Sequence, residues 1–314
     1  MSGQKVALLG ATSHVAKNLV AGMASTHQLS LFARSTEKVA AFLSSQGINE
    51  GTTQVLALDS FGEQATPFDA VINCVGFGTP EKVRSQGADI FAVTERYDNV
   101  VLDYLAQYPS TVYVNFSSGA VYGTDSLHPV DKDAEFRVRL DSITVADAYR
   151  IAKLSSEAKH RSLVGRSIID LRLFSFFSRH IDMTSSYLVT EMVRAIREGV
   201  EFVTNDVEIV RDYVHTEDLC DLVSRCVQSK DINRPFDVYS SRPCRKSEII
   251  RAFRERFGLK VRMVEGPVEI SPTGVKSCYS SNNHDAGAAL GYAPRYSSLD
   301  ALLDEAQALL SAKA

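Results

Sequence analysis

The chain has 314 residues and a net charge of −4 at pH 7; 45% of its residues are hydrophobic and 23% are charged. This composition is that of a globular protein with an ample core, in one large or two smaller domains. It excludes a basic surface for nucleic acid, and no apolar run approaches the roughly 18 residues of a membrane helix. The amino terminus carries no signal-peptide pattern. We therefore expect a cytoplasmic protein that acts on small molecules, without nucleic-acid or membrane partners.

Strands and helices alternate in the first half of the chain. Apolar runs predict buried strands at residues 5–9, 29–33, 55–58, 70–75, 111–116 and 167–173. Helical spacing of apolar residues predicts helices at 11–23, 36–45, 91–108 and 146–163. Such interleaving predicts an α/β fold, a doubly wound parallel (Rossmann) sheet covered by helices on both faces. We place this first domain at residues 1–173.

The alternation is less regular in the second half. We expect helices at 185–198, 216–228, 246–257 and 299–310, and strands at 201–203 and 260–264. A further strand at 235–239 can return to the main sheet, so the segment near 211–240 belongs in part to the first domain. The remainder, residues 174–314, is predicted to form a smaller mixed α/β domain that binds the substrate.

The turn after the first strand reads Gly10-Ala-Thr-Ser-His-Val-Ala16. A dinucleotide-binding turn carries three glycines spaced three apart, and only Gly10 is retained here. Ser13 and Ala16 replace the other two, and both are small. The helix that follows presents free N–H groups and a positive dipole end to a pyrophosphate. The residues expected to contact a dinucleotide here are Gly10, Thr12, Ser13, His14 and Val15.

The end of the second strand favours one dinucleotide over another. A carboxylate there would bind the 2′-hydroxyl of NAD, whereas a cation suits the 2′-phosphate of NADP. The strand ends at Arg34-Ser35, so we expect NADP, with NAD as the alternative. At the ends of two other strands, we expect Asp59 to meet the edge of the adenine, and Cys74, Val75 and Gly76 to lie beside the cofactor. Five widely spaced cysteines and no zinc-binding spacing of histidines predict reduced thiols and no metal site.

Tyr149 and Lys153 are four residues apart on a predicted helix, and therefore lie on one face of it. A lysine ammonium beside a phenol favours the ionised phenol, which can then exchange a proton with a substrate. Ser118 ends a predicted strand some thirty residues earlier. The three side chains together indicate a site for redox chemistry at a carbonyl or alcohol.

Six motifs in this order resemble those of the extended short-chain dehydrogenase/reductases, in particular the NAD(P)-dependent sugar epimerase/dehydratase family. The first is the Gly10 turn, and Ser117-Ser-Gly-Ala-Val-Tyr-Gly123 is similar to the end of the family's catalytic strand. The others are Tyr149-Arg-Ile-Ala-Lys153, Leu171-Arg-Leu-Phe-Ser175, Arg211-Asp-Tyr-Val-His-Thr-Glu-Asp218 and Leu290-Gly-Tyr-Ala-Pro294. The resemblance covers nearly the whole chain.

The resemblance implies a role for each matching residue. Tyr149 would be the acid/base, Lys153 would bind the nicotinamide ribose, and Ser118 would hydrogen-bond the reacting oxygen. Arg211 would pair with a substrate phosphate. Leu173 would lie at the cofactor, and Ser175 stands where the family has an asparagine near the substrate diphosphate. A second phosphate-binding arginine is missing near residues 271–274, where Lys276 is the substitute. The family also implies a homodimer through the helices at 91–108 and 146–163.

The dipeptide Gly119-Ala120 narrows the set of reactions that the family resemblance allows. The family's 4,6-dehydratases carry an acidic pair there, and its epimerase/reductases carry a cysteine, so both activities are disfavoured. Reduction of a keto group on a nucleotide-linked sugar remains, with 4-epimerisation through a transient ketone as the alternative. Arg34 favours the reductase, because a reductase exchanges NADPH whereas an epimerase retains NAD. A non-catalytic NADP-binding regulatory protein is a third hypothesis.

Overall fold

The structure is a computed structural model that describes residues 3–48, 51–76, 87–123, 127–266 and 277–311. Within these ranges, seven parallel strands form the main sheet in the order β11-β6-β5-β4-β1-β2-β3. They are β1 (Lys5–Leu9), β2 (Gln28–Ala33), β3 (Thr53–Ala57), β4 (Ala70–Asn73), β5 (Val112–Ser118), β6 (Ile168–Leu173) and β11 (Asn233–Val238). The strand order reverses between β1 and β4, as in doubly wound dinucleotide-binding folds. The predicted α/β fold is confirmed.

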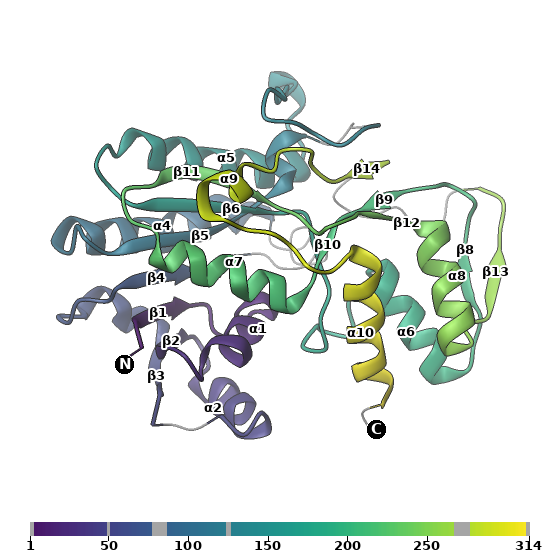
Figure 1. The fold of residues 1–314 in the computed structure, drawn as a ribbon. Helices are drawn as coiled ribbons and strands as arrows, with labels where there is room; N and C mark the ends of the chain where they lie inside the picture. Colours follow the sequence, from purple (N-terminus) through teal and green to yellow (C-terminus); the bar gives the residue numbers. More distant parts are fainter. Residues whose placement is uncertain (1–2, 49–50, 77–86, 124–126, 267–276, 312–314) are drawn as a thin grey trace.

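Helices cover both faces of this sheet (Figure 1). One face packs against α1 (His14–Met23), α2 (Thr36–Ser45) and α7 (Thr216–Gln228), and the other against α4 (Ile90–Gln107) and α5 (Val145–Ser162). Val6 and Leu8 of β1 belong to the first core, and Ala7 and Leu9 belong to the second. Alternate strand residues thus face opposite cores, which explains why the strands read as continuous apolar runs.

A second group of elements surrounds its own core (Figure 1). Helices α6 (Leu188–Glu198), α8 (Lys246–Phe257) and α10 (Ser298–Ser311) meet around Met192, Phe253 and Leu302. Short strands pair in three small sheets separate from the main sheet. They are β7 (Ser175–Phe176), β8 (Phe202–Thr204), β9 (Val210–Arg211), β10 (Tyr213–Val214), β12 (Cys244–Arg245), β13 (Val261–Met263) and β14 (Cys278–Tyr279), and α9 (Asp285–Leu290) packs on β11.

Most predicted elements are present, with shifted ends. Helix α1 begins at His14 rather than residue 11, because Ser13 is its N-cap and accepts a hydrogen bond from the Ala16 N–H at 3.2 Å. The strand expected at 55–58 ends at Ala57, and a 3-10 turn, η1 (Leu58–Glu63), follows it. Strand β11 joins the main sheet beside β6, as predicted for residues 235–239. The boundary between domains at residues 173 and 174 stays a prediction.

The two-residue strands could not be predicted, because their partners are distant in sequence. Strand β9 pairs with β12 on one side and with β14 on the other. A dipeptide carries no periodicity, so only the tertiary fold shows this pairing. In the part of the chain that the structure describes, no helix is long and apolar enough to span a bilayer.

Candidate active site

The motif residues gather at one edge of the main sheet. Since all the strands of this sheet are parallel, their carboxyl ends lie together, and the Gly10 turn, Arg34, Cys74 and Ser118 each follow or end such a strand. In open α/β sheets the ligand lies outside the carboxyl ends, where the strand order reverses. The reversal here lies between β1, which ends before Gly10, and β4, which ends before Cys74.

Gly10 has a backbone conformation that other residues rarely adopt, with φ at +77°. A Cβ built on it would lie 2.9 Å from the Val75 nitrogen, so the two turns approach each other closely. Gly10 N–H and Ala11 N–H both donate to the carbonyl of Phe32, at 2.9 and 3.1 Å. A glycine is therefore required at this position, and the turn leaves the start of α1 open to a phosphate group.

The start of α1 is built as a capped helix end. Thr12 is exposed, and Val15 packs at the margin of the first core. The ring of His14 turns away toward the second half of the chain, where Nε2 lies 2.8 Å from Ser178 Oγ. Burial, followed by the nearby charge of His180, lowers the pKa of His14 to about 3, so the imidazole is neutral. The backbone N–H of His14 at the start of α1, rather than the imidazole ring, is therefore suited to bind an anion.

The end of β2 carries a carboxylate that sequence analysis missed. Arg34 is exposed, and Ser35 is the N-cap of α2. Ser35 Oγ donates to Glu37 Oε2 at 2.9 Å, and Thr36 Oγ1 lies 3.3 Å from the other oxygen of Glu37. A backbone hydrogen bond and these hydroxyl groups lower the pKa of Glu37, so it is ionised at neutral pH. The spacing Ser35-Thr-Glu37 in the first turn of a helix was the available signal.

The remaining predicted cofactor residues follow β3 and β4, and their side chains differ in exposure. Asp59 lies in η1 and pairs with Arg96 at 2.9 Å, and both side chains are mostly exposed. Cys74 is buried, which raises the pKa of its thiol, and the nearby Lys153 ammonium opposes this shift. The Val75 N–H donates to Asn73 Oδ1 at 3.0 Å, which fixes the turn that leads to Gly76.

Lys153 lies close to this turn. Its ammonium donates to the carbonyl of Phe116 at 2.8 Å, and a Cβ on Gly76 would lie 3.7 Å from Lys153 Nζ. The residue is 7% exposed, so its charge is held in place by the end of β5. Tyr149 lies one helical turn earlier in α5, where its half-buried ring packs against Ile90 and Ala152. The phenol and the ammonium therefore share one face of α5, as the spacing predicted.

The two serines at the end of β5 have different partners. Ser117 Oγ donates to Glu157 Oε1 of α5 at 2.6 Å. Ser118 Oγ accepts a hydrogen bond from the Ala120 N–H at 3.1 Å and lies 3.1 Å from the hydroxyl of Tyr279. Ser117 thus fixes α5 against the strand, whereas Ser118 is in contact with a second phenol.

Tyr279 is a site residue that sequence analysis did not identify. Burial raises the pKa of its phenol above the usual value; the Ser118 hydrogen bond opposes this effect, and the nearby Tyr149 adds to it. Tyr279 therefore contacts Ser118 and lies within the electrostatic range of Tyr149. No short pattern marks Tyr279, because it reaches the site through the pairing of β14 with β9.

Gly119 makes room for an aromatic ring. A Cβ on Gly119 would lie 2.5 Å from ring atoms of Phe174, well inside van der Waals contact. The Phe174 ring in turn packs against Tyr279 with 5.0 Å between centroids. A side chain at position 119 would therefore displace Phe174, and the absence of an acid or cysteine there has a packing reason.

Two of the predicted substrate residues, Ser175 and Arg211, lie on the short strands, whereas Ser118 ends β5 and Leu173, predicted at the cofactor, ends β6. Ser175 starts β7, which pairs with β10, and its N–H donates to the Asp212 carbonyl at 3.1 Å. Arg211 ends β9 directly opposite Tyr279 of β14, and its guanidinium bonds the Val210 carbonyl at 2.8 Å. Leu173 ends β6 directly opposite Ser118. Lys276 and residues 271–274 lie outside the described residues.

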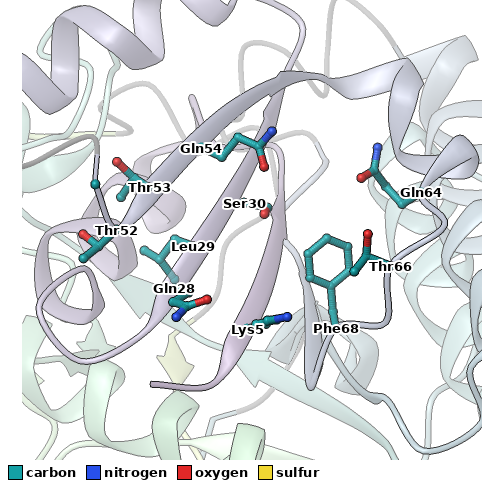
Figure 2. A pocket seen from close by; sticks show the side chains of 11 residues that line it. Lys5, Gln28, Leu29, Ser30, Thr52, Thr53, Gln54, Gln64, Thr66 and Phe68 are labelled. Carbon is teal, nitrogen blue, oxygen red and sulfur yellow. The ribbon is translucent and has the colours of Figure 1, made fainter. Parts of the chain in front are cut away.

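A separate pocket of about 310 Å³ lies at the opposite edge of the sheet (Figure 2). Its walls come from the amino ends of β1, β2 and β3 and from the segment before β4, with Lys5, Gln28, Thr53 and Phe68 among the lining residues. None of the motif residues lines it. The motif residues lie instead at the carboxyl edge, and the fold with its Gly10 turn is that of the doubly wound dinucleotide-binding proteins.

The chain belongs to the NAD dependent epimerase/dehydratase family, within the extended short-chain dehydrogenase/reductases. The family profile matches residues 6–240, three quarters of the chain. The cofactor of this family is NAD(P), and the site described above fits it: a glycine cradle at Gly10, an open helix start, and a lysine beside the cofactor turn. No curated protein sequence matches the chain.

Solved structures with the same fold include sugar-nucleotide enzymes. A UDP-N-acetylglucosamine 4-epimerase from Methanobrevibacter ruminantium superposes with a TM-score of 0.82 at 15% identity, covering 100% of both chains. A UDP-glucose 4-epimerase from Stenotrophomonas maltophila, with bound NAD, reaches 0.82 at 18% identity over 98% of each chain. A dTDP-glucose 4,6-dehydratase from Bacillus anthracis, also with NAD, reaches 0.75 at 13% identity, covering 97% and 96% of the two chains.

Proposed function

We propose that this protein is a 4-epimerase of nucleotide-linked sugars that acts through a transient 4-ketone. The observation that carries the proposal is the convergence of Tyr149, Lys153 and Ser118 at the carboxyl edge, next to the Gly10 turn. The similar structures described as UDP-sugar 4-epimerases support this reaction more than reduction. The Phe174 ring fills the space that a side chain at position 119 would need, and this supports the exclusion of dehydration.

The residues act on the sugar C4–O bond. Tyr149 acts as the general base that takes the proton of the C4 hydroxyl, with the Lys153 ammonium one helical turn away, and Ser118 donates a hydrogen bond to the oxygen. NAD(P), held at the Gly10 turn and beside Lys153, would supply the hydride-transfer chemistry at the sugar carbon. Once the ketone presents its other face, Tyr149 gives the proton back, and no net oxidation occurs. Arg211 holds the diphosphate during this turn.

The cofactor preference belongs to this proposal. Arg34 favours NADP, but the ionised Glu37 lies two residues beyond Ser35 at the same strand end. A carboxylate there repels a 2′-phosphate and suits the 2′-hydroxyl of NAD. NAD retained between turnovers is what an epimerase needs. If Arg34 outweighs Glu37, NADPH is bound and exchanged, and reduction of a 4-keto-sugar becomes the function.

One experiment separates these functions. The purified protein is incubated with UDP- and dTDP-linked hexoses and either NAD or NADPH, while NMR follows the sugar and absorbance follows reduced nicotinamide. An epimerase produces the C4 epimer without net change in absorbance. A reductase consumes one NADPH for each 4-keto-sugar reduced. A protein that binds cofactor but converts no sugar in the panel is the non-catalytic regulator, and the enzymatic proposal is then rejected.

Assembly and location follow from the family resemblance alone. Helices α4 and α5 pack against each other, and we propose that they pair with the same helices of a second subunit. Light scattering on a sizing column measures this directly, because a homodimer has about twice the 34.5 kDa mass of the chain. A cytoplasmic location stays a prediction.

A further inference from the structure

The Ser118 hydroxyl has limited hydrogen-bonding capacity, and its neighbours use most of it. A serine oxygen accepts two hydrogen bonds and donates one. The Ala120 N–H already donates to Ser118 Oγ at 3.1 Å. The hydroxyl of Tyr279 lies at the same distance of 3.1 Å from that oxygen. If Tyr279 is the donor, both acceptor positions of Ser118 are filled, and its own hydrogen is the only group left to offer.

The chemistry of the two hydroxyls favours Tyr279 as the donor. A phenol is the stronger acid of the two, because its ordinary pKa is about 10, far below that of an aliphatic alcohol. Burial raises the pKa of Tyr279 further, so the phenol keeps its proton over the working pH range. Tyr279 therefore has a proton to donate at every pH at which the enzyme works.

The position of Tyr279 is fixed on three sides. Its backbone pairs with Arg211 across β14 and β9, and the Asp212 N–H donates to the Tyr279 carbonyl at 3.3 Å. The ring of Phe174 packs against it at 5.0 Å, in the space that Gly119 leaves free. A side chain held in this way loses little conformational freedom when it makes a hydrogen bond, so the contact with Ser118 is preorganised.

We propose that Tyr279 is a positioning residue that donates to Ser118 and thereby aims the Ser118 hydrogen at the reacting sugar oxygen. The inference rests on the proposed function, because that oxygen is the one from which Tyr149 takes a proton. A chain of two hydrogen bonds polarises its second member, so Ser118 becomes a better donor to the oxygen. The smaller group of elements thus acts on catalysis through β14 rather than by substrate contact alone.

The test is a double-mutant cycle on the full chain with bound cofactor, with Tyr279→Phe, Ser118→Ala and the double variant. We expect Tyr279→Phe to lower kcat about tenfold, the loss of one hydrogen bond, with KM changed by less than about threefold. Ser118→Ala should lower kcat more, and the double variant should equal Ser118→Ala, because Tyr279 acts only through that serine. If the losses of kcat in the two single variants instead multiply in the double variant, the proposal is overturned.

Tyr104→Phe is the matched control. Tyr104 is also a buried tyrosine, and its hydroxyl donates to the Thr66 carbonyl at 3.0 Å rather than to a site residue. It should keep the wild-type kcat even where its melting temperature falls. A similar loss of kcat in Tyr104→Phe would show that any buried tyrosine hydroxyl has this effect, and would reject a specific role for Tyr279.

A second measurement does not depend on turnover. In protein labelled at tyrosine ¹³Cζ, the Tyr279 resonance is the one that disappears in Tyr279→Phe. Ser118→Ala should shift this resonance, because the Tyr279 hydroxyl loses its acceptor, whereas the resonance of Tyr104 should not respond. If no sugar is converted but the shift is observed, the proposed function fails and the Tyr279–Ser118 contact stands. If the shift is absent, the contact and the inference fail, whatever the activity.

Discussion

Glu157 of α5 accepts a hydrogen bond from Ser117 Oγ at 2.6 Å, at the end of the strand that carries Ser118. Arg172 of β6 binds the same carboxylate through Nη2 at 2.5 Å, so one buried acid joins α5 to two strands of the sheet. This contact lies one helical turn beyond Lys153 and two beyond Tyr149. It sets the distance between the acid/base helix and the edge where the substrate reacts.

Tyr149→Phe should abolish turnover and leave the fold intact. The phenol hydroxyl is the proposed acid/base, and its loss should lower kcat by about 10²–10⁴-fold. Cofactor binding, followed by fluorescence, should be unchanged. Tyr108→Phe is the control, because that hydroxyl bonds the Ala65 carbonyl and takes no part in the site. Retained activity in Tyr149→Phe would reject the assigned acid/base.

Substitutions at the end of β2 should change cofactor preference in opposite directions. Arg34→Ala should weaken NADPH about tenfold more than NADH, whereas Glu37→Gln should improve NADPH binding relative to NADH. Calorimetric titration of all four dinucleotides measures this. Lys38→Ala, one residue beyond Glu37 in α2, is the control and should not weaken the binding of one cofactor more than that of the other. Equal losses for the two cofactors in Arg34→Ala would show that Arg34 does not contact the 2′-phosphate.

Arg211→Ala should affect substrate binding more than chemistry. Loss of a charge-assisted contact with a phosphate predicts a KM for the nucleotide sugar that is higher by about 10–100-fold, with a smaller change in kcat. Arg245→Ala is the control, because Arg245 lies on the neighbouring strand β12 with an exposed side chain. Steady-state kinetics that show an unchanged KM in Arg211→Ala would place the phosphate elsewhere.

Gly119→Ala should reduce both stability and activity. The added methyl would lie 2.5 Å from the Phe174 ring, and overpacking of this kind costs about 1–3 kcal/mol. Displacement of Phe174 also disturbs Tyr279, so kcat should fall with the melting temperature. In Gly62→Ala the nearest contact of the new methyl is at 3.9 Å, and this variant should behave as wild type. Calorimetry and kinetics on the two variants compare the effects.

His160 makes the stability of the fold depend on pH. Burial lowers its pKa, but hydrogen bonds to Asp170 and Asp98 and their charges outweigh this effect and raise the pKa to about 9. The protonated form is thus favoured in the folded state, and its stabilisation is complete below about pH 6.5 and lost as pH rises through about 9. The free energy of unfolding should fall by about 3 kcal/mol over this window.

Urea denaturation at pH 6.5, 7.5 and 9 measures this dependence. His160→Gln should be less stable at pH 6.5, because Asp98 and Asp170 each lose one of their cationic partners and keep only Lys159 and Arg161 respectively. The stability of this variant should also vary much less between pH 6.5 and 9. A wild-type protein whose unfolding free energy is constant over the window would show that His160 is neutral in the folded state.

The sequence by itself determined the alternation of strands and helices, the sheet, and the residues that follow each strand. It did so because both periodicity and strand-end turns are local properties, and parallel strands bring their carboxyl ends to one edge. Tyr149 and Lys153 could be placed on one face from their spacing alone. The Gly10 turn could be recognised because only glycine tolerates its conformation.

Only the tertiary structure decided how these residues are supported. Tyr279 reaches Ser118 across 161 positions of the chain, through a two-residue strand that has no periodicity to detect. Phe174 fills the space over Gly119 because β6 ends beside β5. Such contacts depend on packing between segments that are distant in sequence. A local sequence pattern does not show which side chains pack against one another in the folded protein.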